Sequence, residues 1–240
     1  MAIRFIDYSK PGKGIDPNQP EPSGIKGFFI HYYRYLWQLV QINLLRLLFS
    51  LPIFTMPAAR AASVRLTRDL YLNRHIWVWS DFLRHFKANF KQALLFGLPC
   101  DTLLFGLYYF LSFYGANVDR FPILLLPMAV SATALLLVLM MGCYAFLMMV
   151  SVNLPLRAIL RNSWKFTLVR FRRNFLLLLI LGALYALNVL LFPATILTLL
   201  FLHFSTCEFL TAAFLWDDMA LNIEKKEPDG NISSENVVGT

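Results

Sequence analysis

Three ionisable residues lie deep inside apolar segments of the sequence: Arg46, Asp101 and Glu208. An unpaired charge at the centre of a bilayer costs at least about 2.5–3.5 kcal/mol, so such residues usually face a protein interior and pair with one another. With a helical rise of about 1.5 Å per residue, all three would lie at a similar depth. We therefore expect Arg46 to pair with Asp101 or Glu208. Asn43, one helical turn before Arg46, would complete the network.

The chemistry of this intramembrane polar cluster leaves three interpretations open. The cluster can clamp helices together, it can line a pathway for a polar solute or a proton, or one carboxyl can stay neutral and unpaired. Asn188 and His203 are further candidate members. If replacing Arg46 lowered the stability of the protein without any other effect, the clamp would be favoured. Loss of transport by a stably folded variant would favour the pathway.

Catalytic and metal-binding signatures are absent from the sequence. It contains no H-E-x-x-H, G-x-S-x-G, Walker or dinucleotide-binding glycine pattern. Cys100, Cys143 and Cys207 lie in apolar segments without C-x-x-C spacing, which is typical of buried thiols that pack as small apolar groups. We expect no enzymatic activity, no catalytic residue, no metal and no cofactor.

The segments that hold the polar cluster are long enough to cross a membrane. Of the 240 residues, 58% are hydrophobic and only 15% are charged, whereas soluble domains are about 25% charged. A membrane-spanning helix needs about 20 mostly apolar residues. The sequence therefore predicts an all-α, polytopic membrane bundle of about five transmembrane helices, with spans near 34–56, 93–114, 122–150, 174–191 and 194–216. We expect a polar N-terminal tail with an interfacial segment at 1–33, a transmembrane domain at 34–216 and a disordered C-terminal tail at 217–240.

Basic residues are concentrated in two of the connections between the predicted spans. Thirteen of the 22 Lys and Arg lie in 57–91 and 151–173. The positive-inside rule places both connections in the cytoplasm, so five spans would put the N-terminus outside and the C-terminus inside the cell. Four basic residues in the N-terminal tail argue for the opposite placement of that end.

Two parts of these connections, 79–90 and 156–171, have apolar residues at helical spacing beside a basic face. Amphipathic helices of this kind lie in the membrane interface and extend Lys and Arg to anionic lipid headgroups. They can also bind a cytoplasmic partner, whereas basic charge placed in this way does not indicate nucleic-acid binding. The candidate lipid-binding or partner-binding residues are Arg60, Arg65, Arg68, Arg84, Lys87, Lys91, Arg157, Arg161, Lys165, Arg170, Arg172 and Arg173.

The two basic connections also resemble each other in sequence. At a constant offset of 85 residues, Phe86 matches Phe171 and Asn89 matches Asn174. This similarity indicates one helical hairpin repeated in the same orientation, followed by a lone fifth span.

Three short motifs carry a resemblance to a known family. They are N-L-L-R-L-L-F-S-L-P-I at 43–53, P-A-A at 57–59 and F-K-A-N-F-K-Q-A at 86–93. Together they resemble the YesL-like family of bacterial membrane proteins, which would place the chain in a bacterial plasma membrane. The family tends to have an aromatic or apolar residue at the position of Arg46 and a smaller residue at the position of Met56, so an Arg46 network would be particular to this chain.

The resemblance also implies a function. Members of the YesL-like family are often encoded beside components of carbohydrate ABC transporters. We therefore expect a non-enzymatic membrane protein that is accessory to carbohydrate uptake or its sensing, with a transporter permease or a sensor kinase as partner. The alternative is a small-solute transporter or channel that uses the Arg46, Asp101 and Glu208 cluster.

Overall fold

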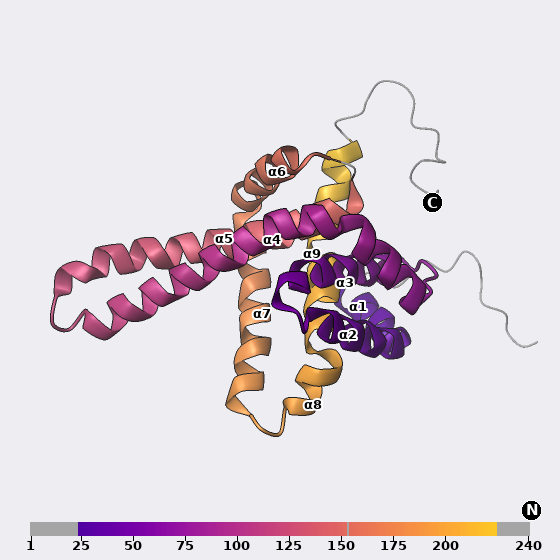
Figure 1. Ribbon diagram of the computed structural model, residues 1–240, viewed down its shortest axis with the longest axis horizontal. Coiled ribbons are helices and arrows are strands. Elements are labelled where there is room, and N and C mark those ends of the chain that lie inside the picture. The colour runs from indigo at the N-terminus through magenta and orange to yellow at the C-terminus, as the bar shows by residue number, and fades with distance from the viewer. Residues whose placement is uncertain (1–23, 153, 225–240) are drawn as a thin grey trace, which may run out of the picture. The chain divides into compact units, whose positions relative to one another are not determined.

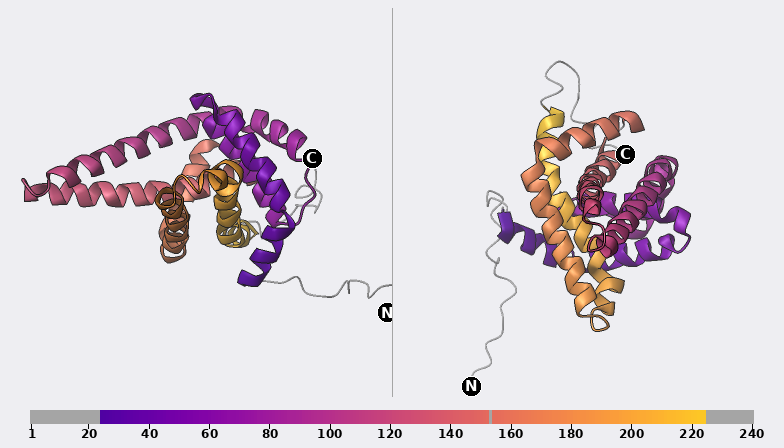
Figure 2. Two further views of the ribbon diagram at one scale, coloured as in Figure 1. Left: turned by 90° about the horizontal axis from the view of Figure 1, so that it is seen from below. Right: turned by 90° about the vertical axis from the view of Figure 1, so that its left-hand side faces the viewer.

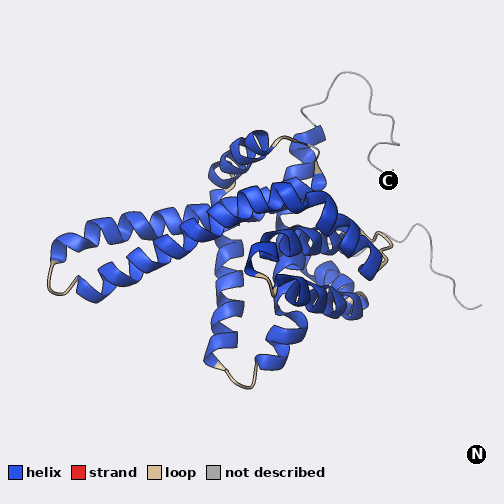
Figure 3. Ribbon diagram, viewed as in Figure 1, coloured by secondary structure: helices blue, strands red, loops and turns tan. Residues whose placement is uncertain are grey.

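The computed structural model describes residues 24–152 and 154–224, and the regular elements of these residues are all helices (Figure 3). The described residues form two compact units, which divide after Arg34. Helix α1 (Gly24–Arg34) belongs to the first unit, where the rings of Phe28 and Tyr32 stack on one face. Helices α2 to α9 belong to the second. The all-α class predicted from the sequence is confirmed.

Helices α2 (Leu36–Ser50) and α3 (Met56–Tyr71) form a hairpin that is closed by a short 3₁₀ turn, Ile53–Thr55. Helix α3 is the centre of the second unit, because it packs against α2, α4, α5 and α9. Its small residues allow this close packing, as in other membrane helices. Those that are fully buried are Ala58, Ala59, Ala61, Ala62 and Ser63. The sequence predicted only a basic connection here, so this buried helix is a difference from the prediction.

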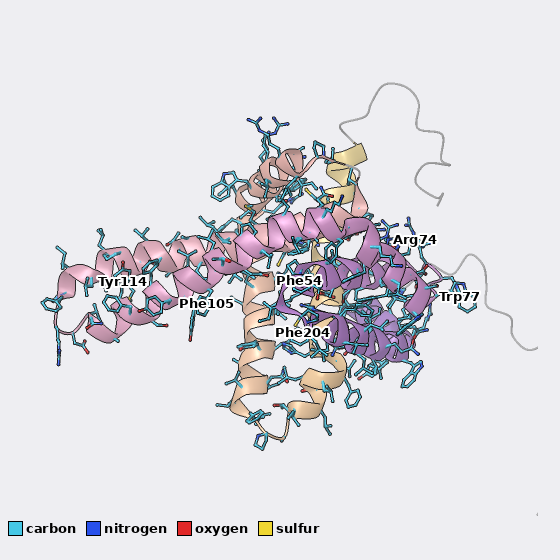
Figure 4. All side chains as sticks on the ribbon, in the orientation of Figure 1. Phe54, Arg74, Trp77, Phe105, Tyr114 and Phe204 are labelled. Carbon is cyan, nitrogen blue, oxygen red and sulfur yellow. The ribbon has the colours of Figure 1, made fainter. Side chains whose placement is uncertain are left out.

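Helices α4 (Val78–Asn117) and α5 (Leu125–Ser151) form a second hairpin, with a 3₁₀ turn at Pro122–Leu124. The far part of this hairpin extends beyond the other helices of the second unit (Figures 1 and 2). Its side chains there are largely apolar and exposed, which matches a lipid environment. The labelled Phe105 and Tyr114 lie on this part of α4 (Figure 4).

The third hairpin consists of α7 (Phe171–Leu190) and α9 (Phe204–Glu224). The amphipathic helix α6 (Leu156–Val169) precedes it, as the sequence predicts for 156–171. Helix α8 (Ile196–Thr198) and a π-helical turn, Leu199–His203, lead directly into α9. The α7–α9 hairpin and the α4–α5 hairpin leave the region of α3 in different directions (Figure 1).

Among the described residues, four helices are long and apolar enough to cross a membrane: Val78–Asn117, Pro122–Ser151, Phe171–Leu190 and Ile196–Ala220. They correspond to the second to fifth predicted spans, and the protein is embedded in a membrane. The first predicted span, 34–56, is not among them. Helix α2 has only 15 residues, or about 22 Å, which is short of a hydrocarbon core of about 30 Å.

Three other predicted boundaries also differ. The amphipathic segment 79–90 and the span 93–114 form one continuous helix, α4, whereas their counterparts α6 and α7 are separated at Arg170. The predicted C-terminal tail begins within α9, which continues to Glu224, and 225–240 lie outside the described residues. Within the predicted N-terminal tail, 24–33 are helical and 1–23 lie outside the described residues.

Candidate functional site

The predicted polar cluster is centred on an ion pair between α2 and α9. Nη1 of Arg46 donates to Oε1 of Glu208, and the hydroxyl of Ser63 on α3 donates to Oε2 of the same carboxylate. The side chains of Arg46 and Glu208 are 15% and 7% exposed. The Arg46 guanidinium also lies 4.6 Å from the centre of the Phe204 ring, within the range of a cation–π contact. The structure confirms the expected pairing of Arg46 with Glu208, and it adds Ser63, which no pattern in the sequence indicated.

Asp101 does not take part in this ion pair. It is half-buried on α4 and forms no hydrogen bond or ion pair with another of the described residues. A depth estimate from residue counting ignores the direction in which a side chain leaves its helix. The prediction that Arg46 pairs with Asp101 or Glu208 is therefore resolved in favour of Glu208.

Asn43 joins α2 to the π-helical turn that precedes α9. Its side-chain amide nitrogen donates to the carbonyl oxygens of Leu199 and Leu200, at 3.2 and 2.7 Å. Its Oδ1 accepts from the backbone N–H groups of Phe204 and Ser205, at 2.9 and 3.0 Å. The wider π-helical turn changes the usual helical pairing, and Asn43, which is fully buried, supplies partners to backbone groups at both ends of the turn.

Asn188 and His203 form a separate contact within the α7–α9 hairpin. Nδ2 of Asn188 lies 3.1 Å from Nδ1 of His203, and the hydroxyl of Thr198 donates to Oδ1 of Asn188 at 2.6 Å. The other ring nitrogen of His203 is 3.9 Å from the Cys207 sulfur. These groups satisfy one another inside the hairpin, so they link its two helices.

Two shallow hollows on the described surface are both lined mainly by apolar residues. One lies on α5 at Ala129–Leu137, and the other lies between the start of α4 and α2, beside Leu44 and Trp79. Neither includes Arg46 or Glu208 in its lining. Among the described residues, no group of three or more His, Cys, Asp or Glu is arranged to hold a metal ion.

A second polar cluster lies where α3 and α5 end. Arg68 is 2% exposed and donates to Oδ1 of Asp69 at 2.6 Å. It also donates to the carbonyl oxygen of Val150 and the hydroxyl of Ser151, at 3.3 and 2.7 Å. Arg65 donates to Asp69 and to the same Val150 carbonyl. Two guanidinium groups therefore satisfy the C-terminal end of α5, where carbonyls lack helical partners and the helix dipole is negative.

This arrangement corrects the assignment of Arg68 as a residue that binds lipid or a partner. Burial lowers the pKa of Arg68 to about 10, while the negative charge of Asp69 acts in the opposite direction. The side chain therefore remains cationic at neutral pH, but its charge is used inside the protein. The charge of Arg65 is also engaged inside the protein, because its guanidinium donates to Asp69 and to the Val150 carbonyl.

Other predicted basic residues are also engaged within the protein. Arg170 and Arg173 pair with Asp218 near the end of α9, at 3.3 and 2.9 Å. Arg84 pairs with Asp81, and Arg60 lies 4.4 Å from the centre of the Phe146 ring.

The remaining predicted basic residues are exposed and have no carboxylate partner among the described residues. Arg157, Arg161 and Lys165 are separated by four residues each, so they follow one face of α6. Trp164 is 44% exposed beside them. Lys87 and Lys91 on α4 and Arg172 on α7 complete the exposed group.

Asn89 and Asn174, which correspond in the sequence repeat, have different contacts. Asn174 donates to the carbonyl oxygens of Phe166 and Thr167 at the end of α6 and accepts from the hydroxyl of Tyr144. Asn89 donates to the carbonyl of His85 within an uninterrupted helix. Asn174 therefore stabilises the break between α6 and α7, whereas its counterpart Asn89 lies in a helix that has no break.

Comparison with known proteins gives one match. The sequence profile of a family described as "Protein of unknown function, DUF624" matches residues 30–112. This segment includes α2, α3 and most of α4, and hence Arg46, Ser63 and Arg68, but not Glu208. No curated protein and no solved structure matches the chain.

Proposed function

We propose that this chain is a non-enzymatic membrane protein that binds a partner in the same membrane through the basic face of α6. The observation that carries the proposal is the division of the basic residues into two groups. Arg65 and Arg68 on α3 and Arg173 on α7 bind internal carboxylates or a helix end, whereas Arg157, Arg161 and Lys165 on α6 are exposed. An exposed row of cations beside Trp164 fits an acidic protein surface at the membrane interface, because Arg and aromatic residues are enriched at binding sites.

We further propose that the partner is a carbohydrate ABC-transporter permease or a sensor kinase. The match to DUF624 supports this step, since YesL-like proteins belong to that family and residues 40–93 resemble them. The sugar-uptake role itself comes from the resemblance. The proposed location is the bacterial plasma membrane, with α6 on its cytoplasmic side.

The alternative function, a small-solute transporter or channel, rests on the polar residues inside the helices. The π-helical turn at Leu199–His203 is the feature that favours it, because such turns are frequent at functional sites. However, Asn43 binds the backbone at this turn, and Arg46 and Glu208 bind each other. These contacts support a clamp that holds α2 against α9.

The proposal is tested by purifying the tagged full-length protein in a mild detergent and identifying its companions by mass spectrometry. We expect a permease or sensor kinase in stoichiometric amount from the wild type. Replacing three cations of α6 (Arg157→Gln, Arg161→Gln, Lys165→Gln) should reduce its recovery at least tenfold. The matched control removes three positive charges from α4 instead (Arg84→Gln, Lys87→Gln, Lys91→Gln) and should retain the partner.

Two outcomes would contradict this function. Recovery of the protein alone would argue against a stable partner and would direct attention to solute flux in variants of Arg46 and Glu208. Equal loss from both triple variants would indicate a general attraction to anionic lipid headgroups instead of a protein site on α6.

A further inference from the structure

We infer that the chain crosses the membrane four times, and that α2 and α3 form a hairpin that enters and leaves on the basic side. The first observation is a contact between the two ends of this hairpin. The hydroxyl of Tyr35, just before α2, donates to Oδ1 of Asn73, just after α3, at 3.1 Å. Residues in direct contact lie at the same depth in a bilayer, so when both are at an interface the chain between them crosses the bilayer an even number of times.

Three other helix ends lie together with the end of α3 on this side. Arg68 near the end of α3 binds Val150 and Ser151 at the end of α5, and its guanidinium lies 4.9 Å from the centre of the Trp216 ring on α9. Arg173 at the start of α7 binds Asp218 two residues after Trp216. The ends of α3, α5 and α9 and the start of α7 therefore share one face of the membrane.

The bend of the hairpin does not reach the opposite face. A Cβ atom on Gly97 of α4 would lie 2.3 Å from Cβ of Pro57, so α4 passes directly against the start of α3. Helix α4 continues for another 20 residues, to Asn117, or about 30 Å. The bend therefore lies far from the connection between α4 and α5.

The bend also has the chemistry of a segment in contact with lipid. Leu51, Ile53 and Phe54 are apolar and 77%, 77% and 56% exposed. The hydroxyl of Thr55 donates to the carbonyl oxygens of Phe49 and Pro52, at 2.6 and 2.7 Å. Polar backbone groups at membrane depth must find partners within the protein, and the buried Thr55 hydroxyl supplies one to two carbonyls at the bend. Phe54, at the bend, and Arg74, beyond the end of α3, are well separated in Figure 4.

This topology changes the orientation expected from five spans. With four crossings, the start of α2 lies on the same side as the end of α9. By the positive-inside rule, that side is the cytoplasm. Five basic residues precede α1 or lie within it (Arg4, Lys10, Lys13, Lys26 and Arg34) and agree with this placement, although the four in the predicted tail opposed the earlier one.

The test is labelling of single cysteines with a membrane-impermeant maleimide, in full-length protein whose native cysteines are replaced (Cys100→Ala, Cys143→Ala, Cys207→Ala). The probe position is Trp37→Cys, in the first turn of α2, where the side chain is 69% exposed. Arg161→Cys marks the basic side and Arg120→Cys marks the connection between α4 and α5. We expect Trp37→Cys to behave as Arg161→Cys does, with labelling in inside-out vesicles at least ten times that in intact cells. Labelling of Trp37→Cys from outside, as for Arg120→Cys, would overturn the topology.

A second measurement decides the case if Trp37→Cys reacts from neither side. In the double variant Tyr35→Cys with Asn73→Cys, a short bis-maleimide should join the two positions within one chain, as detected by mass spectrometry of the digested protein. The double variant Tyr35→Cys with Arg120→Cys should not be joined. The inference fails if the first pair does not cross-link or if the second pair does.

Discussion

At the residue scale, the Arg46–Glu208 pair has an asymmetric energetic role. Removing both charges from water is costly, so a buried pair adds little stability compared with apolar residues, but loss of one partner leaves the other charge uncompensated. The two partners differ here. A carboxyl can take up a proton and become neutral, whereas a guanidinium stays charged at any accessible pH.

This asymmetry predicts the order of three variants. Glu208→Leu should destabilise the protein most, on the order of 3–5 kcal/mol, because Arg46 is left charged and buried. Arg46→Leu should cost less, because Glu208 can be protonated and retains the hydrogen bond from Ser63. The double variant should be more stable than Glu208→Leu. Thermal unfolding of the three proteins in one detergent gives the ranking. If the double variant were the least stable of the three, the ion pair would stabilise the fold by more than the neutralisation of each charge by the other.

Asn43 provides a second prediction at this scale. Asn43→Leu keeps a side chain of similar size but leaves backbone groups of the π-helical turn without partners. Each unsatisfied buried group costs about 1–3 kcal/mol, so we expect a loss on the order of 3 kcal/mol. Gln41→Leu, two residues earlier on α2, is the control, because Gln41 is half-buried and makes no hydrogen bond to a described residue. Equal melting temperatures for the two variants would refute a clamping role for Asn43.

The sequence predicted the ion pair because charged residues in apolar segments have few ways to be accommodated. Residue types and counting along each helix were enough to bring Arg46 and Glu208 together, whereas Asn43 binds the backbone of the π-helical turn and does not complete their network. Residue types and counting were not enough to exclude Asp101, because its direction depends on how α4 is rotated against α3. The contribution of Ser63 was also hidden, since a serine in a segment rich in basic residues has no distinctive spacing.

At the element scale, α3 is the feature that the sequence did not reveal. Its arginines made 57–91 look like an exposed cytoplasmic connection, and its mean composition is not that of a membrane span. The signal that was present is the run of Ala and Ser at 58–63, since small residues allow helices to approach closely. The burial of Arg68 then depends on partners that are distant in sequence, namely the end of α5 and Trp216.

The contact between α3 and α4 gives a prediction with an internal control. Gly97→Ala places a methyl group within 2.3 Å of the Pro57 ring, so the two helices must separate. We expect a loss of about 1–3 kcal/mol, typical of overpacking. Gly106→Ala, on the same helix, meets nothing within 4 Å and should be neutral or stabilising by up to about 1 kcal/mol, the usual gain from replacing Gly in a helix. In thermal unfolding, the melting temperature of Gly97→Ala should therefore fall, whereas that of Gly106→Ala should stay the same or rise. Equal losses of stability in the two variants would mean that helix propensity or lipid contact, and not the contact with Pro57, determines the effect of alanine at both positions.

At the scale of the whole molecule, the fold class followed from the sequence but the number of membrane crossings did not. Residues 34–56 are apolar enough to suggest a span, yet Pro52 ends α2 and the chain turns back at Thr55. Hydropathy cannot distinguish a helix that crosses a bilayer from one that stops within it. The contacts of Tyr35 with Asn73 and of Arg68 with Trp216 supply that information.

The same view of the whole molecule separates surfaces that meet lipid from surfaces that meet a partner. The far part of the α4–α5 hairpin is apolar and exposed, with Phe105 at 72%, and it carries few charges. Helix α6 combines exposed cations with Trp164. The first surface therefore fits contact with lipid, and the second fits contact with a partner.

The most direct test of this assignment is photo-cross-linking in living cells with benzoylphenylalanine in place of an exposed aromatic residue. Placed at Trp164, it should yield a defined cross-linked protein band that mass spectrometry identifies as a transporter permease or a sensor kinase. Placed at Phe105, it should yield no protein band. A defined band at Phe105 with none at Trp164 would contradict partner binding by α6, because the binding surface would then be the apolar hairpin instead of the basic face of α6.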